Sequence, residues 1–171
     1  MRGDLHTLKR VCEYASKVML VAEFVLAAII VATIVLAVAA LFVEDAESFL
    51  LDLISASDSD SMLRKVSSVL KFLMIWVLGF VTVKAVHDVM CTIRDEHSPF
   101  TKVNTDRMIA ASLIYLGAAF IFLLLDVLIA TRPAEAVFLF LGLTLVSVVL
   151  YCLALVCRYG AVLQKESDET L

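Results

Sequence analysis

Four ionisable side chains lie within long apolar stretches of the chain, where charge is most able to do chemistry. They are two acids, Glu23 and Asp126, and two lysines, Lys71 and Lys84. A charge inside a bilayer is costly, so such residues usually pair or mark a path for ions or protons. By depth within their stretches, Asp126 matches Lys71 and Glu23 matches Lys84. The sequence predicts two ion pairs, and a proton or cation path through the two acids is the alternative.

The two lysines also predict how the helices are ordered. Lys71 and Lys84 are 13 residues apart in the sequence, which is roughly 220° around an α-helix. Their side chains therefore leave the helix on different sides. We expect this second apolar helix to lie between the first and the third.

Histidine and cysteine side chains are candidates for a metal site. His87 and Cys91 are four residues apart on a predicted helix, and His97 follows in a loop. These residues are an incomplete zinc set, because a carboxylate would have to supply the fourth ligand. The sequence has no spacing typical of a catalytic nucleophile and no glycine-rich phosphate loop. We expect no metal, no cofactor and no enzymatic activity.

The elements that carry these residues are predicted from the apolar pattern. The chain is 62% hydrophobic and 19% charged, with a mean hydropathy of +0.98. Four apolar runs occupy about residues 18–43, 66–89, 108–130 and 134–157, and a helix of about 20 such residues crosses a bilayer. The prediction is an all-α polytopic membrane protein, a single domain with four transmembrane helices in one bundle. A cleaved signal in the first run is disfavoured because that run is too long.

The distribution of Lys and Arg predicts the orientation in the membrane, since positive residues near span ends stay in the cytoplasm. One side of the predicted topology carries Arg2, Lys9, Arg10, Lys17, Lys84, Arg94, Lys102, Arg107, Arg158 and Lys165. The other side carries Arg64, Lys65, Lys71 and Arg132. We therefore expect both termini and residues 90–107 to be cytoplasmic. We expect residues 44–65 to form an outer acidic loop, with a short interfacial helix over residues 49–54.

Local signals predict two helix contacts. Pro133 and Glu135 suit the first turn of a helix, so the third and fourth apolar helices should be antiparallel neighbours. Ala28/Ala32 and Thr33/Ala37 have the spacing of small residues that lets two helices approach closely. That spacing predicts a packing face on the first helix, toward the bundle or toward a second subunit.

A polar break at residues 98–104 separates the second and third apolar helices. Pro99 stops the preceding helix, which continues past the apolar run with an apolar stripe of Val86, Val89, Met90 and Ile93. Thr101 is a good N-cap, and Asn104 is a weak capping-box partner. Phe100 is expected to plug into the bundle.

The residues Pro99-Phe100-Thr101-Lys102-Val103-Asn104 resemble the P-F-T-x-E-N signature of an uncharacterised prokaryotic four-span membrane family (YoaS-like). Val103 stands where the signature has Glu. The resemblance implies a four-helix prokaryotic membrane protein of unknown activity, of a kind often encoded beside a small helix-turn-helix regulator.

Two functions remain open at this point. The first is an interaction or regulatory module in the cell membrane, whose cytoplasmic residues 86–104, with Arg94, Lys102 and Arg107, dock a protein such as that regulator. The second is a small oligomeric transporter or pore that uses Glu23 and Asp126. The expected partners are the lipid bilayer, a cytoplasmic protein and further copies of the chain, with no direct contact to nucleic acid.

Overall fold

The structure is a computed structural model that describes residues 2–54, 61–96, 100–129 and 133–169. All regular elements in these ranges are α-helices: α1 (Arg2–Ala39), α2 (Glu44–Leu53), α3 (Met62–Glu96), α4 (Lys102–Ile129) and α5 (Pro133–Glu169). Four of them are long and apolar enough to cross a membrane, within Arg10–Ala39, Met62–Arg94, Lys102–Val127 and Ala134–Ser167. This is an all-helical bundle with the composition of a multi-pass membrane protein.

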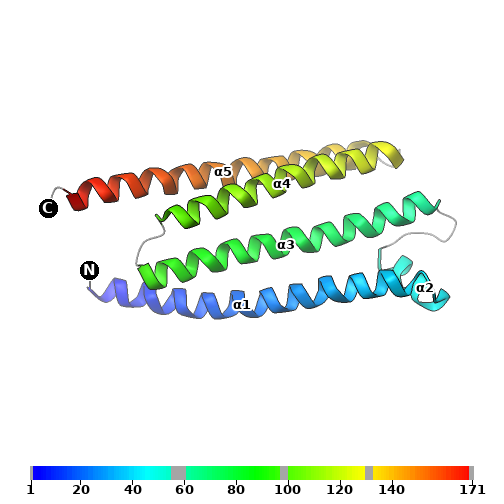
Figure 1. The fold of residues 1–171 in the computed structure, drawn as a ribbon, viewed down its shortest axis with the longest axis horizontal. Helices are drawn as coiled ribbons and strands as arrows, with labels where there is room; N and C mark the ends of the chain where they lie inside the picture. The colour runs from blue at the N-terminus through cyan, green and yellow to red at the C-terminus, as the bar shows by residue number, and fades with distance from the viewer. Residues whose placement is uncertain (1, 55–60, 97–99, 130–132, 170–171) are drawn as a thin grey trace.

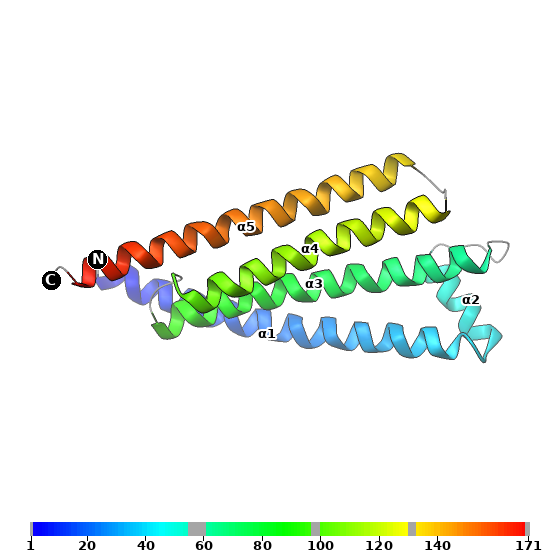
Figure 2. The same cartoon turned by 45° about the horizontal axis from the view of Figure 1, so that its top comes forward.

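The four long helices are arranged in the order α1, α3, α4 and α5 across the molecule (Figures 1 and 2). In the described ranges the extensive contacts between long helices are α1 with α3, α3 with α4, and α4 with α5. The prediction that the second apolar helix lies between the first and third is therefore confirmed. Both chain ends lie at the same end of the bundle as the end of α3 and the start of α4 (Figure 1).

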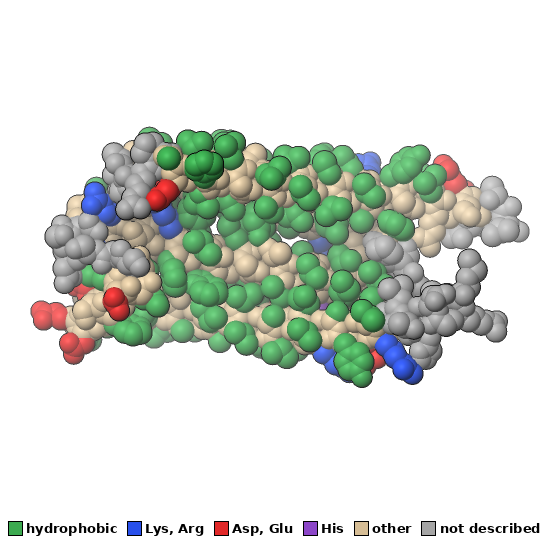
Figure 3. Space-filling model, turned by 180° about the vertical axis from the view of Figure 1, so that it is seen from behind, with side chains coloured by type: hydrophobic (Ala, Val, Ile, Leu, Met, Phe, Trp, Pro, Cys, Tyr) green, Lys and Arg blue, Asp and Glu red, His purple; other side chains and the backbone are tan. Residues whose placement is uncertain are grey.

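Most helix ends lie beyond the apolar runs that predict them, but α1 ends at Ala39, four residues before the predicted end at residue 43, because the chain turns at residues 40–42. At 1.5 Å per residue, the 38 residues of α1 and the 37 of α5 are each about 55 Å long, whereas the hydrocarbon layer is about 30 Å thick. Most of residues 90–107, predicted to lie between the second and third spans, are likewise helical, because α3 continues past its apolar run to Glu96 and α4 begins before its own at Lys102. Hydrophobic side chains dominate the middle of the visible surface, and charged side chains gather toward its ends (Figure 3).

The α1–α3 contact follows a seam with alternating steps of four and three residues on α1. This is the spacing at which two helices pack side by side along their length. The buried or half-buried seam residues are Cys12, Ser16, Met19, Glu23, Leu26, Ile30, Thr33 and Ala37. Thr33 and Ala37 confirm half of the predicted small-residue face, whereas Ala28 and Ala32 are exposed on the outside of the bundle.

Small residues also allow α4 and α5 to pack closely. The buried small residues on these two helices are Ala111, Ser112, Ala118, Ala119, Ala136, Ser147 and Ala154. The Ser147 hydroxyl donates a hydrogen bond of 2.7 Å to the Ser112 carbonyl. Close approach of helices through small residues is how association is achieved in lipid, where there is little hydrophobic driving force. The predicted neighbourhood of these two helices is confirmed, and α5 begins at Pro133 as expected.

A short helix covers one side of the bundle at the opposite end from the termini. The sequence predicts a short helix over residues 49–54; α2 begins earlier, at Glu44, and buries Leu50 and Leu51. The Glu47 carboxylate accepts a hydrogen bond of 2.8 Å from Lys65 at the start of α3. This contact joins α2 to the bundle beside the connection that leads into α3.

Candidate functional site

The predicted ion pair between Lys71 and Asp126 is present. The Lys71 ammonium on α3 donates a hydrogen bond to the Asp126 carboxylate on α4. The Asp126 side chain is only 11% exposed and the Lys71 side chain 25%. Both charges lie within the segments able to span the membrane, so each neutralises the other where water is scarce.

Glu23 contacts His87, and the prediction that it meets Lys84 is wrong. The Glu23 carboxylate on α1 lies 2.6 Å from Nδ1 of His87 on α3, and the two side chains are 17% and 13% exposed. Lys84 is exposed. Depth along α3 does not distinguish residues 84 and 87, which are less than one helical turn apart. The rotation of α3 against α1 decides between them, and it turns His87 toward Glu23.

A third polar contact, between α3 and α4, lies along α3 between the Lys71–Asp126 and Glu23–His87 contacts. The Tyr115 hydroxyl contacts the Thr82 hydroxyl and donates a hydrogen bond of 3.3 Å to the Leu78 carbonyl. The two α3 residues of these contacts, Lys71 and Thr82, are eleven positions apart in the sequence. Their α4 partners, Asp126 and Tyr115, are also eleven positions apart, in the opposite direction along the chain. Eleven residues are about three helical turns, so both contacts lie on the same face of each helix and fix one register.

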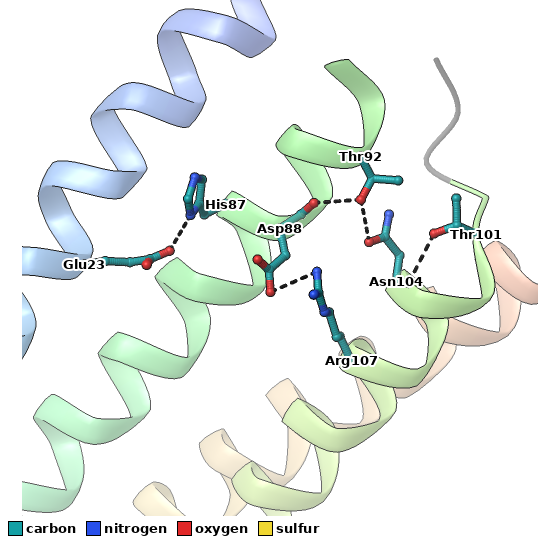
Figure 4. A network of polar contacts seen from close by, with 7 residues as sticks. All are labelled: Glu23, His87, Asp88, Thr92, Thr101, Asn104 and Arg107. Carbon is teal, nitrogen blue, oxygen red and sulfur yellow. Dashed lines mark hydrogen bonds and ion pairs between the residues drawn. The ribbon is translucent and has the colours of Figure 1, made fainter. Parts of the chain in front are cut away.

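The end of the bundle near the termini holds a network of polar side chains on α3 and α4 (Figure 4). The Arg107 guanidinium forms an ion pair of 3.2 Å with the Asp88 carboxylate. The Thr92 hydroxyl lies 2.9 Å from the Asp88 carbonyl oxygen and 3.0 Å from Oδ1 of Asn104. We call Asp88, Thr92, Asn104 and Arg107 the α3–α4 network. Asn104 is completely buried, so its amide is committed to contacts inside the protein.

Thr101 caps α4 as the sequence predicts. Its hydroxyl accepts a hydrogen bond of 3.2 Å from the Asn104 backbone N–H, and its carbonyl accepts one of 3.1 Å from the Thr105 N–H. These are contacts typical of an N-cap, where the first N–H groups of a helix lack partners within it. The Asn104 side chain has a different role from the predicted one, because its Oδ1 reaches across to Thr92 on α3.

Phe100 packs at the edge of the bundle and does not plug into its centre. The side chain is 39% exposed. A Cβ built on Gly160 of α5 would lie 2.6–2.9 Å from three ring carbons of Phe100, which is closer than carbon atoms approach. The absence of a side chain at residue 160 therefore lets the ring rest on α5. Pro99, the predicted helix stop, lies outside the described residues.

The apolar stripe predicted at the end of α3 is only partly exposed to solvent. Val86, Val89, Met90 and Ile93 are all half-buried, as is Arg94 in the last turn of the helix. More exposed apolar surface is found on the other side of the break. Val103 in the first turn of α4 is 56% exposed, and it lies close to the exposed Phe100, Lys102 and Arg107.

The candidate zinc ligands do not converge among the described residues. Nδ1 of His87 contacts Glu23, whereas the Cys91 thiol lies 3.7 Å from the Ser16 hydroxyl on α1. His97 lies outside the described residues. Among the described side chains, no three His, Cys, Asp or Glu lie close enough together to hold a metal ion.

Three of the contacts that build this site were missed from the sequence: Glu23–His87, Asp88–Arg107 and Thr92–Asn104. A signal for two of them exists. In an antiparallel helix pair, residues equally far from the turn lie opposite each other, and Thr92 and Asn104 are each six residues from Ser98. Asp88 and Arg107 are ten and nine residues from it. Counting outward from the break would have placed both pairs together.

Comparisons of this chain with protein-family models, with curated proteins and with solved structures found no match.

Proposed function

We propose that this multi-pass membrane protein is an interaction or regulatory module that presents the start of α4 to a cytoplasmic partner protein. The docking surface consists of the exposed residues Phe100, Lys102, Val103 and Arg107, which we call the end surface. The partner class is a small helix-turn-helix regulator, on the strength of the resemblance to the YoaS-like family. The host membrane is the cell membrane.

The observation that carries this proposal is apolar surface beside positive charge, outside the apolar run of α4. That run starts at Met108, so Val103 lies five residues, or about 7 Å, before it. The proposal places its side chain among headgroups or in water, outside the hydrocarbon layer. Aromatic residues and Arg are enriched at protein interfaces, which exposed apolar patches mark. A partner with an acidic, partly apolar face is the complement.

The α3–α4 network supports the proposal because it holds this surface in one shape. Thr101 fixes the first turn of α4, and Asn104 and Arg107 tie that turn to α3. A preordered surface loses less conformational freedom on binding. The cytoplasmic orientation is supported by the Lys and Arg distribution. It places both chain ends and the end surface on the same side of the membrane.

A photo-crosslinking amino acid at Val103 tests the docking function in living cells. We expect one protein adduct at residue 103, weakened at least several-fold by Lys102→Glu, because reversing one charge opposes an acidic partner. Lys17→Gln, which removes an exposed cation on α1 outside the end surface, should leave the adduct unchanged. A crosslinker at Leu41, which is 73% exposed on the turn after α1, is the matched control at the opposite end.

The proposal is contradicted if residue 103 gives no protein adduct while the variant is present in the membrane at normal levels. An adduct of equal strength at Leu41 would contradict it as well, since it would report general crowding at the membrane. Identification of the adduct by mass spectrometry decides whether the partner is a transcription regulator.

Transport through the bundle is the alternative, and the titratable Glu23–His87 contact is the observation in its favour. The apolar stretch between the two acids is against it: Leu73, Met74, Val77 and Leu78 occupy α3 between Lys71 and Thr82. Proton or cation flux in proteoliposomes measures this function directly. We expect the same leak for the wild type, Glu23→Gln and Asp126→Asn; flux that either substitution abolishes would establish the transport function instead.

A further inference from the structure

A cavity of about 490 Å³ opens on the α4–α5 pair and is separate from the α3–α4 network. Four of its lining residues come from α4 and four from α5: Lys102, Thr105, Asp106, Ile109, Arg158, Ala161, Val162 and Lys165. On both helices they fall at steps of three, four and seven residues, the spacing of a single helix face. We call this cavity the basic groove.

The charges of the basic groove favour an anion. Lys102, Arg158 and Lys165 provide three positive charges, and Asp106 provides one negative charge. Lys165 also contacts Glu169 at 3.6 Å, but both side chains are more than 60% exposed. An exposed ion pair of this kind contributes little stability, so a bound anion can replace the Glu169 carboxylate at small cost. The groove also lies at the N-terminus of α4, where the helix dipole adds positive potential.

The position of the groove indicates what kind of anion it binds. Arg158 directly follows the apolar run of residues 134–157, so the groove begins where the hydrocarbon layer should end. Ile109 and Val162 give it apolar walls. The exposed side chains of Leu155 and Tyr151, three and seven residues before Arg158, continue the same face of α5 into its apolar run. A phosphate among cations with apolar chains next to it is the chemistry of a phospholipid. Basic pockets between transmembrane helices bind acidic lipid headgroups in this way.

We propose that the basic groove is a binding site for one anionic glycerophospholipid, its phosphate held by Arg158, Lys102 and Lys165. The acyl chains then lie along the apolar surface of α4 and α5. This inference does not depend on the docking function or on the orientation of the protein. It requires only that the groove lies at a membrane–water boundary.

Native mass spectrometry of the full chain in neutral detergent tests the site, with phosphatidylglycerol and phosphatidylcholine as the two lipids. We expect preferential binding of phosphatidylglycerol to the wild type. Each removed cation should weaken it about fivefold, so Arg158→Gln with Lys165→Gln should weaken it roughly 25-fold. Asp106→Asn should strengthen binding because it removes the opposing carboxylate. Lys17→Gln on α1, an exposed cation outside the groove, should leave it unchanged.

Several results would overturn the proposal. Equal binding of the two lipids would exclude headgroup charge as the determinant, and an equal loss in Lys17→Gln would show only general attraction to a basic protein end. Competition by glycerol 3-phosphate as strong as that by the lipid would assign the groove to a soluble phosphate. Arg158 and Lys165 are exposed, and a melting curve of each variant verifies that it is folded.

Discussion

Asp126→Ala should destabilise the protein by about 3 kcal/mol, the largest effect we expect from a single substitution. The change leaves the Lys71 ammonium without its carboxylate partner inside a membrane-spanning segment. Removing one partner of a buried pair usually costs about 3–5 kcal/mol. The lower value applies here because both residues lie toward the ends of their spans, where an unpaired ammonium can extend toward the headgroups. The measurement is reversible unfolding in micelles, followed by the fluorescence of Trp76, the single tryptophan, on α3.

The double variant Lys71→Met/Asp126→Leu should recover most of the lost stability, because replacing both charges by apolar groups leaves neither unpaired. The control is Glu13→Ala, which breaks an exposed pair with Lys17 on α1 and should leave the unfolding midpoint unchanged. If the double variant remained as unstable as Asp126→Ala, the interpretation that Asp126 serves only to pair with Lys71 would be wrong. Asp126 would then act through something other than Lys71.

Asn104→Ala should destabilise the end of the bundle by about 2 kcal/mol. Asn104 is completely buried, and its Oδ1 contacts the Thr92 hydroxyl on α3. Truncating a buried hydrogen-bonding group loses its bond and leaves its partner less well satisfied, at a cost of about 1–3 kcal/mol. Hydrogen exchange should report the change locally. The backbone amides of residues 104–106 should exchange faster, while those in the middle of α4 remain protected.

The control is Val103→Ala, one position away but 56% exposed, which should leave exchange unchanged. Thr92→Val removes the partner hydroxyl and keeps the shape of the side chain. In a double-mutant cycle it should add little to Asn104→Ala, since both remove the same contact. Full additivity of the two substitutions would mean that the hydrogen bond between them contributes nothing to stability.

Much of the fold follows from local features of the sequence. Four apolar runs of bilayer length predict four long helices, Thr101 predicts the start of α4, and Pro133 predicts the start of α5. These features depend only on neighbouring residues. The depth of a charge in its helix is also local, because it can be counted along the chain. For that reason the pairing of Lys71 with Asp126 could be predicted.

The remaining contacts depend on how each helix is rotated about its axis. Lys84 and His87 lie at nearly the same depth, and the seam of α1 residues that packs on α3 brings His87 to Glu23. Rotation is decided by the fit of complete helix faces, which involves residues far apart in the sequence. Phe100 resting on Gly160 and the basic groove between α4 and α5 have the same origin.

The sequence by itself thus determined the number of membrane helices, most of their ends and the depth of each charge, because those properties are set by composition and spacing along the chain. The tertiary structure decided which polar side chains meet, that Asn104 ties α4 to α3, and which cations share a groove. Those properties depend on the register and rotation of helices against one another. Side-chain packing fixes them only when the helices are assembled.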